Sequence, residues 1–382
     1  MEKIEKIYPR LVKIRKDLHQ CPEKAFQEYQ TAQYLKKVLE EEKIPYETVG
    51  MTGIVATIKG KKSEAEGEKE ERILAFRTDM DGLPMEEETE LEWKSRNGWM
   101  HSCGHDMHMT MVLGAGIILN QEKENWHGTV KLIFQPAEEI GEGAEQMIAS
   151  GKLEGIDTIV ALHMNPQEEK GKFLTGYGAR TTQGICLNLT IKKDKKTAEN
   201  VAVEVASRIV ELVDKKTASE KNFKNHISLS PTIINTEENG DVKLFYDGRT
   251  FCDDDSDRME EIIDHITGVI ETFYPVKIQK KVVRIGGSVQ NDTGAVKRTE
   301  KILTALYGRE SWTESPPAMF GEDFRCYAKI IPHLVFSMLG GSAGEKRYGL
   351  HNCHVTFDNN ALKSGTGYYV GYARDYFKHT GA

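Results

Sequence analysis

The sequence predicts an α/β protein with a mostly parallel sheet, helices on both faces and an inserted ferredoxin-like α+β domain. Two observations indicate this class. Apolar, strand-like runs such as 72–80, 129–136 and 157–163 alternate with helix-like runs, as in α/β folds with parallel strands. Over residues 182–291 the order of elements changes to β-α-β-β-α-β, the ferredoxin-like order. A length of 382 residues fits two domains.

The individual elements follow from the spacing of apolar residues. Ile4, Ile7, Leu11, Ile14 and Leu18 recur at helical intervals, so we expect an N-terminal helix. Further helices are expected over 31–42, 110–119, 143–151, 197–216, 255–273, 295–308 and 360–378. Strands are expected over 53–60, 72–80, 129–136, 157–163, 185–193, 226–234, 241–251, 276–285 and 333–339. The predicted domains are therefore 1–181 with 292–382, and the insert 182–291.

Charge and composition exclude several classes of partner. The net charge is −8, with 51 basic and 59 acidic residues, whereas nucleic acids and membrane surfaces call for a basic face. We see no apolar stretch of bilayer-spanning length and no signal peptide at the N-terminus. The six cysteines are scattered without a Cys-x-x-Cys pair, which argues against a disulfide framework or a zinc ribbon. We therefore expect a cytoplasmic protein without nucleic-acid or membrane partners.

Acidic, imidazole and thiol side chains gather where predicted strands end. Taken singly, each has a structural explanation, such as a turn aspartate or a hydrogen-bonded core histidine. Their joint placement favours one shared site, because sites in open α/β sheets form at the carboxyl ends of strands. The side chains concerned are Asp79 and Asp81, Cys103 and His105 at a helix start, Glu138 and Glu139, and His163.

This set of side chains suits a divalent metal. Thiolate, imidazole and carboxylate together favour Zn²⁺, with Mn²⁺, Co²⁺ or Ni²⁺ as alternatives, and two such ions could activate one water. Adjacent glutamates allow one ligand and one general base. The rival interpretation makes Cys103 a nucleophile with His105 or His108 as its base. It leaves the strand-end acids without a role, so the metal site is the leading prediction.

Several longer motifs carry a family resemblance. They cover most of residues 10–180 and 300–375, and they are "DLHQCPEKAFQE", "RTDMDGLPMEEETEL", "MHSCGHDMHMT", "LIFQPAEE", "ALHMNP", "PPAMFGEDF" and "LHNCHVTFDNNAL". In this order they resemble the amidohydrolase branch of the dinuclear metallo-aminoacylase and carboxypeptidase family, peptidase family M20. The motifs "HDMHMT" and "PAMFGEDF" most resemble those of the branch members that deacetylate N-acetyldiaminopimelate in lysine biosynthesis. Hippurate hydrolases and aminoacylases share much of the rest.

The resemblance implies a function and a role for individual residues. It implies a zinc-exopeptidase-like catalytic domain, two divalent ions per subunit, a small N-acyl amino acid as substrate, and a homodimer formed through the inserted lid domain. The implied metal ligands are Cys103, His105, Glu139, His163 and His351. Glu138 matches the general base, Asp81 the acid that orients a ligand imidazole, and Arg249 the group that binds a substrate carboxylate. The resemblance gives His354 no role, and we treat it as non-ligating.

The insert departs from the family pattern in two places. Residues 191–200, "IKKDKKTAEN", lack the glycines and the oxyanion-stabilising histidine of the family's segment, and "NTEENGDVK" lacks its asparagine. Two hypotheses follow: an active amidohydrolase with altered specificity, or a metal-binding homologue with weak or lost hydrolysis and an assembly or regulatory role. We favour hydrolysis, because Glu138 is retained although no metal needs it.

Overall fold

The computed structural model describes residues 2–61, 72–193, 201–219, 228–238, 241–344 and 346–378. The chain forms two compact units. Unit 1 comprises Met1–Arg180, Gln290–Pro316 and Cys326–Ala382, and unit 2 comprises Thr181–Val289 and Pro317–Arg325. By this division, the segment 317–325, which the sequence assigns to the catalytic domain, belongs to unit 2. Among the described helices, none has an apolar stretch long enough to cross a bilayer.

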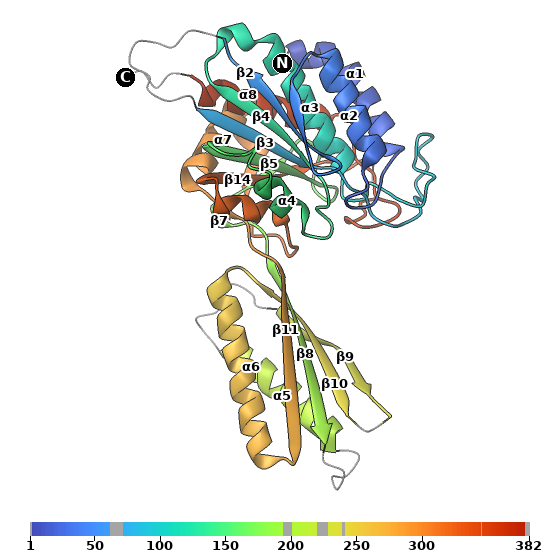
Figure 1. The fold of residues 1–382 in the computed structure, drawn as a ribbon, viewed down its shortest axis with the longest axis vertical. Helices are drawn as coiled ribbons and strands as arrows, with labels where there is room; N and C mark the ends of the chain where they lie inside the picture. The colour runs from blue at the N-terminus through green and yellow to red at the C-terminus, as the bar shows by residue number, and fades with distance from the viewer. Residues whose placement is uncertain are drawn as a thin grey trace. The chain divides into compact units, whose positions relative to one another are not determined.

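Unit 1 is built on a mixed, mostly parallel sheet (Figure 1). Its strands, in spatial order, are β1 (Tyr46–Val49), β2 (Gly53–Lys59), β4 (Thr129–Gln135), β3 (Ile73–Asp79), β5 (Thr158–Asn165), β14 (His333–Gly340), β6 (Phe173–Thr175) and β13 (Trp312–Glu314). The central run β4-β3-β5-β14 is parallel, while β1, β2 and the β14–β6 pair are antiparallel. The predicted mostly parallel α/β class is confirmed. A separate ribbon pairs β7 (Gly178–Ala179) with β12 (Gln290–Asn291).

Helices cover this sheet on both faces, as predicted. They are α1 (Glu2–His19), α2 (Tyr29–Glu41), α3 (His105–Gln121), α4 (Gly143–Ala149), α7 (Thr293–Tyr307) and α8 (Ala361–Tyr376), with 3-10 turns at Lys123–Asn125, Arg309–Ser311 and Asp323–Lys329. The core packs α1, α3, α7 and α8 against alternate strand residues such as Phe76 and Leu132. Helix α4 covers the opposite face of the sheet. Its Met147 lies against Gly53 of β2, whereas the next residue, Ile54, points to the core on the first face.

The apolar helix α3 is buried along almost its whole length, and this fixes the site that begins at its N-terminus. It contacts α1, α8 and the sheet at once. Small residues allow the close approach: a Cβ at Gly114 would lie 2.8 Å from a methyl of Leu11, and one at Gly365 would lie 1.9 Å from the sulfur of Met111. A helix held on three sides presents its first turn in one fixed position.

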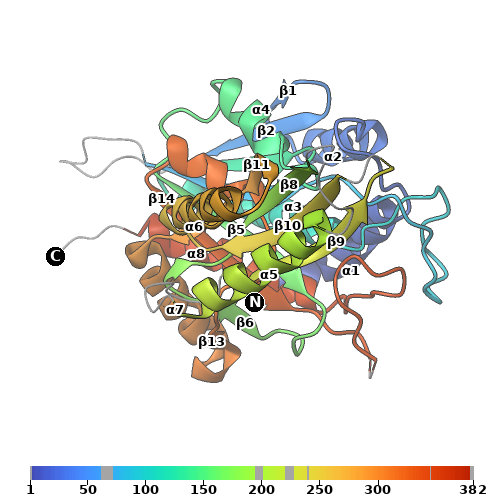
Figure 2. The same cartoon turned by 90° about the horizontal axis from the view of Figure 1, so that it is seen from below.

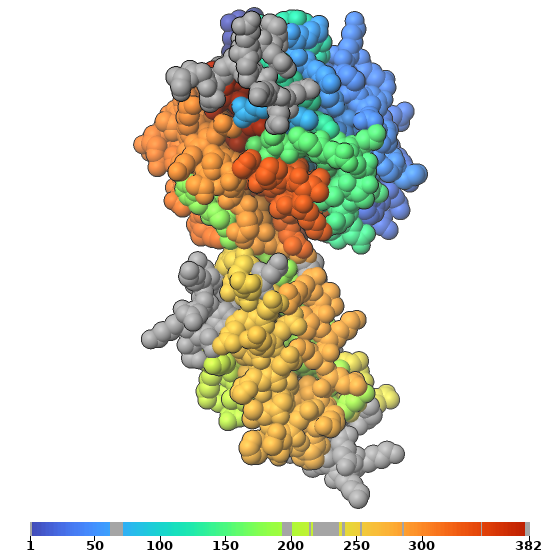
Figure 3. Space-filling model, turned by 60° about the vertical axis from the view of Figure 1, so that its left-hand side comes forward, coloured from blue at the N-terminus to red at the C-terminus, as the bar shows by residue number. Residues whose placement is uncertain are grey.

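Unit 2 has the ferredoxin-like arrangement expected for the insert. Its elements are β8 (Gln183–Lys193), α5 (Val201–Ser219), β9 (Ser228–Thr236), β10 (Val242–Thr250), α6 (Asp253–Phe273) and β11 (Val276–Gly286). The strands pair antiparallel in the order β11-β8-β10-β9. Helices α5 and α6 pack side by side on one face of this sheet (Figure 2). The space-filling view shows α6, in yellow and gold, along the surface of this unit (Figure 3).

Candidate metal centre

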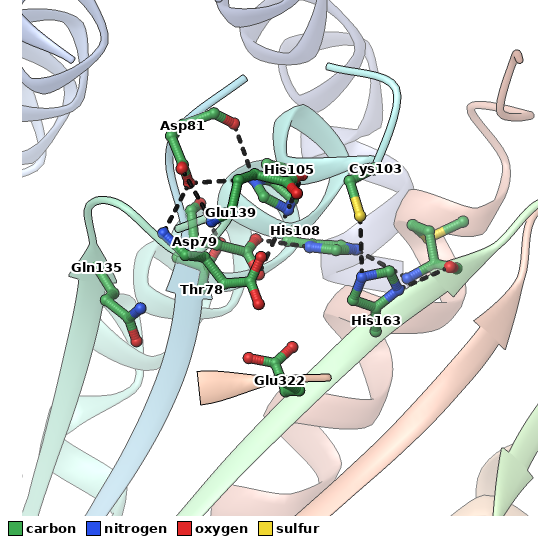
Figure 4. A network of polar contacts seen from close by, with 12 residues as sticks. Thr78, Asp79, Asp81, Cys103, His105, His108, Gln135, Glu139, His163 and Glu322 are labelled. Carbon is green, nitrogen blue, oxygen red and sulfur yellow. Dashed lines mark hydrogen bonds and ion pairs between the residues drawn. The ribbon is translucent and has the colours of Figure 1, made fainter. Parts of the chain in front are cut away.

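The predicted metal-site residues converge at one end of the unit 1 sheet. Strands β4, β3 and β5 are parallel neighbours, so the segments that follow them meet at the same edge. Asp79 ends β3, and Asp81 follows it by two residues. Glu138 and Glu139 follow β4, and His163 lies near the end of β5. His105 begins α3, and Cys103 lies just before this helix. Figure 4 shows Cys103, His105, Glu139 and His163 gathered at this edge together with Asp79 and Asp81.

Short distances join the five predicted ligands. Cys103 Sγ lies 3.4 Å from His163 Nε2. His105 Nε2 lies 3.7 Å from Glu139 Oε1, and the other oxygen of Glu139 lies 3.5 Å from His351 Nε2. Separations of this size are expected between ligands that share one ion, since each metal–ligand bond is about 2.0–2.3 Å long. The structure therefore brings together all five residues, although they are far apart in the sequence.

The donor atoms fall into several overlapping sets that share members. Cys103, His105 and His163 offer donor atoms within 4.8 Å of one another, and so do Cys103, Glu139 and His351. A third set joins His105 and Glu139 to the carboxylate of Glu138. Because Cys103 and Glu139 each belong to more than one set, the arrangement suits two neighbouring ions rather than one.

Hydrogen bonds to the main chain point the ligand histidines toward this centre. His105 Nδ1 lies 2.8 Å from the carbonyl oxygen of Asp81, and His163 Nδ1 lies 2.8 Å from the carbonyl oxygen of Met164. We assign the ring proton to Nδ1 in both cases, because a carbonyl oxygen can only accept. In each ring this turns Nε2, rather than Nδ1, toward the cluster of donors, an orientation usual for ligand histidines.

Two buried carboxylates hold the segment that carries the glutamate pair. The carboxylate of Asp81 accepts hydrogen bonds from the N–H groups of Glu138 and Glu139, both at 3.1 Å. Glu28 accepts one from the N–H of Ala137 at 2.9 Å, where the backbone has a φ of +55°. Asp81 thus positions His105 through its carbonyl group and the two glutamates through its carboxylate. The sequence predicts only the first of these roles, the orientation of an imidazole.

The electrostatics of the centre favour a positive charge among the donors. Burial opposes charge on His105, but Asp79, Asp81 and Glu139 raise the pKa of its imidazole to about 10. Burial raises the pKa of the Glu139 carboxyl and lowers that of the His163 imidazole. His105 Nε2 and Glu139 Oε1 are also buried without a hydrogen-bond partner. A divalent cation would satisfy both atoms and balance the carboxylates, so the residues present fit a metal.

His351 reaches the centre from a separate segment with a constrained backbone. Its φ is +58°, unusual for a residue other than glycine, and its N–H donates to the carbonyl oxygen of Ser102 at 3.3 Å. Strained backbone of this kind concentrates at functional sites. The side chain is half exposed, so His351 lies at the open side of the donor cluster.

Other predicted features lie outside this cluster. Arg249 belongs to unit 2, on β10, with a guanidinium nitrogen 3.6 Å from a carboxylate oxygen of Asp247, and its part in substrate binding stays a prediction. Most of the divergent segment 191–200 lies outside the described residues, as do 239 and 240 of the second divergent motif.

Sequence reasoning missed the role of the Asp79–His108 pair. His108 Nδ1 lies 2.7 Å from Asp79 Oδ1, and His108 Nε2 accepts the N–H of Met164 at 2.8 Å. With both ring nitrogens bonded, His108 has no free position for the general-base role of the cysteine-nucleophile hypothesis. The position of Asp79 at a strand end was the available signal, but no sequence pattern indicates its partner.

Comparisons with known proteins agree with this architecture. The family model "Peptidase family M20/M25/M40" matches residues 75–375. A probable hydrolase, sll0100, of Synechocystis sp. is 31% identical, with 94% of this chain and 93% of the relative covered. N-acetyldiaminopimelate deacetylase of Bacillus velezensis is 30% identical, with 96% and 98% covered. The crystal structure of the Bacillus subtilis YXEP protein, described as a dinuclear metal binding peptidase from the M20 family, superimposes with a TM-score of 0.84 at 27% identity, covering 98% of this chain and 99% of that one.

The family match spans most of the chain, and the similarity to whole relatives extends over both units. The cluster of thiol, imidazole and carboxylate donors lies within the matched residues. On these grounds the chain is a hydrolase of peptidase family M20/M25/M40.

Proposed function

We propose that the protein is a metal-dependent amidohydrolase that cleaves the amide bond of N-acyl amino acids. The observation that carries this proposal is the carboxylate of Glu138, which is not among the five expected ligands and lies within 4.8 Å of the donor atoms of His105 and Glu139. Metal-dependent hydrolysis needs such a group, since a proton must leave the attacking water and another must reach the departing amine. A site that only stored or sensed a metal would not need it.

Five residues would hold the metal: Cys103, His105, Glu139, His163 and His351. The mixture of thiolate, imidazole and carboxylate suits Zn²⁺ or Mn²⁺, with Co²⁺ or Ni²⁺ as substitutes. When bound, such an ion polarises the amide carbonyl and lowers the pKa of water. Nε2 of His105 and Oε1 of Glu139 are buried without a hydrogen bond, which supports this assignment.

The protein's own residues would move the protons. Glu138 accepts a proton from the attacking water as its oxygen bonds to the acyl carbon. The same carboxyl then donates that proton to the amide nitrogen as the carbon–nitrogen bond breaks. The products are a carboxylic acid and a free amine, so water supplies every atom gained. Asp81 keeps Glu138 in place through the N–H hydrogen bond at 3.1 Å.

The substrate class rests on the relatives and on Arg249. One relative, N-acetyldiaminopimelate deacetylase of Bacillus velezensis, is named for an N-acetylated amino acid. It aligns with nearly the whole chain. In our proposal the guanidinium of Arg249 binds the substrate's carboxylate, for which its fork of donors is suited. The expected substrate is therefore a small N-acyl amino acid with a free carboxylate.

A hydrolysis screen tests the proposal. The protein would be stripped of metal, reloaded with Zn²⁺, Mn²⁺, Co²⁺ or Ni²⁺, and assayed for amine release from N-acetyl and N-benzoyl amino acids, including N-acetyldiaminopimelate. We expect turnover that depends on added metal. Bound metal without turnover on any substrate of the panel would instead support the alternative, a metal-binding homologue with an assembly or regulatory role.

We also propose a homodimer formed through unit 2. Within the described residues, β9 and β11 form the two edges of its sheet, and an open edge can pair with a second copy. Apolar side chains are exposed nearby: Phe273 at the end of α6 is 79% exposed, and Val269 and Val283 are 41% and 39% exposed. Sedimentation equilibrium would test this. A monomer at all micromolar concentrations would contradict it.

A further inference from the structure

A second group of metal-binding side chains lies in unit 1, apart from the five donors of the main centre. It consists of Glu88, Cys353 and His354, whose thiol, imidazole and carboxylate donor atoms all lie within 4.8 Å of one another. None of the three has a role in the proposed reaction. Thiolate, imidazole and carboxylate are together the usual ligand types of Zn²⁺.

Main-chain contacts hold the two segments of this cluster in place. The N–H of Glu88 donates to the carbonyl oxygen of Cys353 at 2.9 Å, which ties the segments together. The N–H of His354 donates to the side-chain oxygen of Asn352 at 2.9 Å, and the ring of Tyr348 packs against the His354 ring with centroids 5.1 Å apart. The donors are thus positioned by bonds that do not involve their own metal-binding atoms.

The orientation of the His354 ring points to a cation. Its Nδ1 lies 3.2 Å from the carbonyl oxygen of Glu88, which can only accept, so we place the ring proton there. The lone pair of Nε2 then faces a carboxylate oxygen of Glu88 at 3.4 Å. Two acceptors at this distance repel unless a proton or a metal ion lies between them.

The distances agree with the metal. Neighbouring ligands of a tetrahedral Zn²⁺ site with bonds of about 2.0–2.3 Å are about 3.3–3.8 Å apart, which includes the separation of Nε2 and the carboxylate oxygen. A ligand histidine also usually donates its second N–H to a carbonyl group, as His354 does to Glu88.

We propose that Glu88, Cys353 and His354 form a peripheral binding site for a Zn²⁺-like divalent cation. The Glu88 and His354 side chains are 61% and 39% exposed, so solvent supplies the remaining ligands and the ion exchanges readily. The three residues of this site are distinct from the five expected ligands of the main centre. Its existence does not depend on whether the main centre hydrolyses amides.

Cobalt titration of protein that carries two equivalents of Zn²⁺, enough for the main centre alone, tests this site, because thiolate-bound Co²⁺ absorbs in the near ultraviolet. We expect a thiolate-to-cobalt band that saturates at one added equivalent. Cys353→Ser should abolish the band, and His354→Gln should weaken Co²⁺ binding about tenfold or more. Two matched controls should keep it: Cys21→Ser, at another half-buried cysteine, and His333→Gln, at an exposed histidine 3.5 Å from a carboxylate of Asp292.

Either of two results would overturn the proposal. If the band persists in Cys353→Ser, the cobalt has exchanged into the main centre. If no band forms at millimolar Co²⁺, the contact between His354 and Glu88 is an ion pair only. A second measurement needs no variant: excess Zn²⁺ should slow the alkylation of Cys353 in the unmodified protein, followed by peptide mass spectrometry. An unchanged rate would also count against the site.

Discussion

His108 donates its Nδ1 proton to the carboxylate of Asp79, across 2.7 Å, beside the predicted ligand His105. The other oxygen of Asp79 lies 3.0 Å from a guanidinium nitrogen of Arg77 and 3.8 Å from Nε2 of His105. Burial disfavours the charged carboxylate, but His105, His108 and Arg77 hold the pKa of Asp79 well below its usual value. Asp79 therefore keeps a fixed negative charge beside the donors.

Asp79→Asn is expected to weaken metal binding and to destabilise the fold. Loss of the negative charge of Asp79 beside His105 should lower metal affinity by about 10–100-fold. It also removes one charged hydrogen-bond partner of the buried Arg77, which should cost about 1.5–3 kcal/mol of unfolding free energy. Chelator competition and urea denaturation measure the two effects.

Asp157→Asn is the matched control for this change. Asp157 accepts the N–H of Ile73 at the opposite end of the same strand, β3. Its replacement should leave metal affinity unchanged. Equal losses of affinity in the two variants would show that Asp79 acts only through general stability.

Glu138→Gln should abolish turnover while keeping the metal. The amide retains the size of the side chain but cannot take a proton from water, so kcat should fall by about 10²–10⁴-fold. Metal content by mass spectrometry should equal that of the unmodified protein. Glu142→Gln, an exposed position on the same segment, serves as the control and should keep full activity. Turnover at the original rate in Glu138→Gln would remove this residue from the mechanism.

Removal of metal should lower the thermal stability of the protein. Without a cation, Nε2 of His105 and Oε1 of Glu139 stay buried without a hydrogen bond. Free metal at a hundredfold excess over its dissociation constant should add about 2.7 kcal/mol of stability. Calorimetry with and without EDTA should therefore show a lower Tm in EDTA, reversed by added Zn²⁺. Identical melting curves would argue that the cluster binds no metal.

A buried network on α1 should make stability depend on pH. His19 lies 3.0 Å from carboxylate oxygens of both Asp106 and Glu87. Burial opposes its charge, but these two acids raise the pKa of His19 above the ordinary value of 6.5. A raised folded-state pKa contributes stability below pH 6.5, and this contribution is lost as the pH rises through the folded-state pKa.

Comparison of the parent with His19→Gln isolates this contribution. The difference in unfolding free energy between the two proteins should be largest at pH 6 and should shrink toward pH 9. Urea denaturation at several pH values measures it. A difference that stays constant with pH would mean that His19 acts only through packing.

Most of the fold could be predicted because it depends on apolar periodicity. The alternation of strands and helices in unit 1 and the β-α-β-β-α-β order of unit 2 follow from patterns that extend over many residues. Short strands were missed: β1, β6, β7, β12 and β13 have two to four residues each. Segments this short carry no readable period, and their pairing is decided by the strands beside them.

The candidate site was predictable in its residue types but not in its supporting contacts. Strand ends and motifs pointed to Cys103 and Glu139, whose donor atoms do lie together with that of His351. The bond between His108 and Asp79 joins residues 29 apart and depends on how α3 packs on the sheet. Such packing is tertiary, so a local pattern of residues cannot reveal it.

The proposed hydrolysis depends most on metal ions held by Cys103, His105, Glu139, His163 and His351. Anomalous diffraction from crystals of the metal-loaded protein, recorded at the absorption edge of the bound metal, tests this directly. We predict two neighbouring peaks within this cluster, with Cys103 or Glu139 adjacent to both. A map without a peak among these five residues, in crystals whose metal content is proven, would contradict the account.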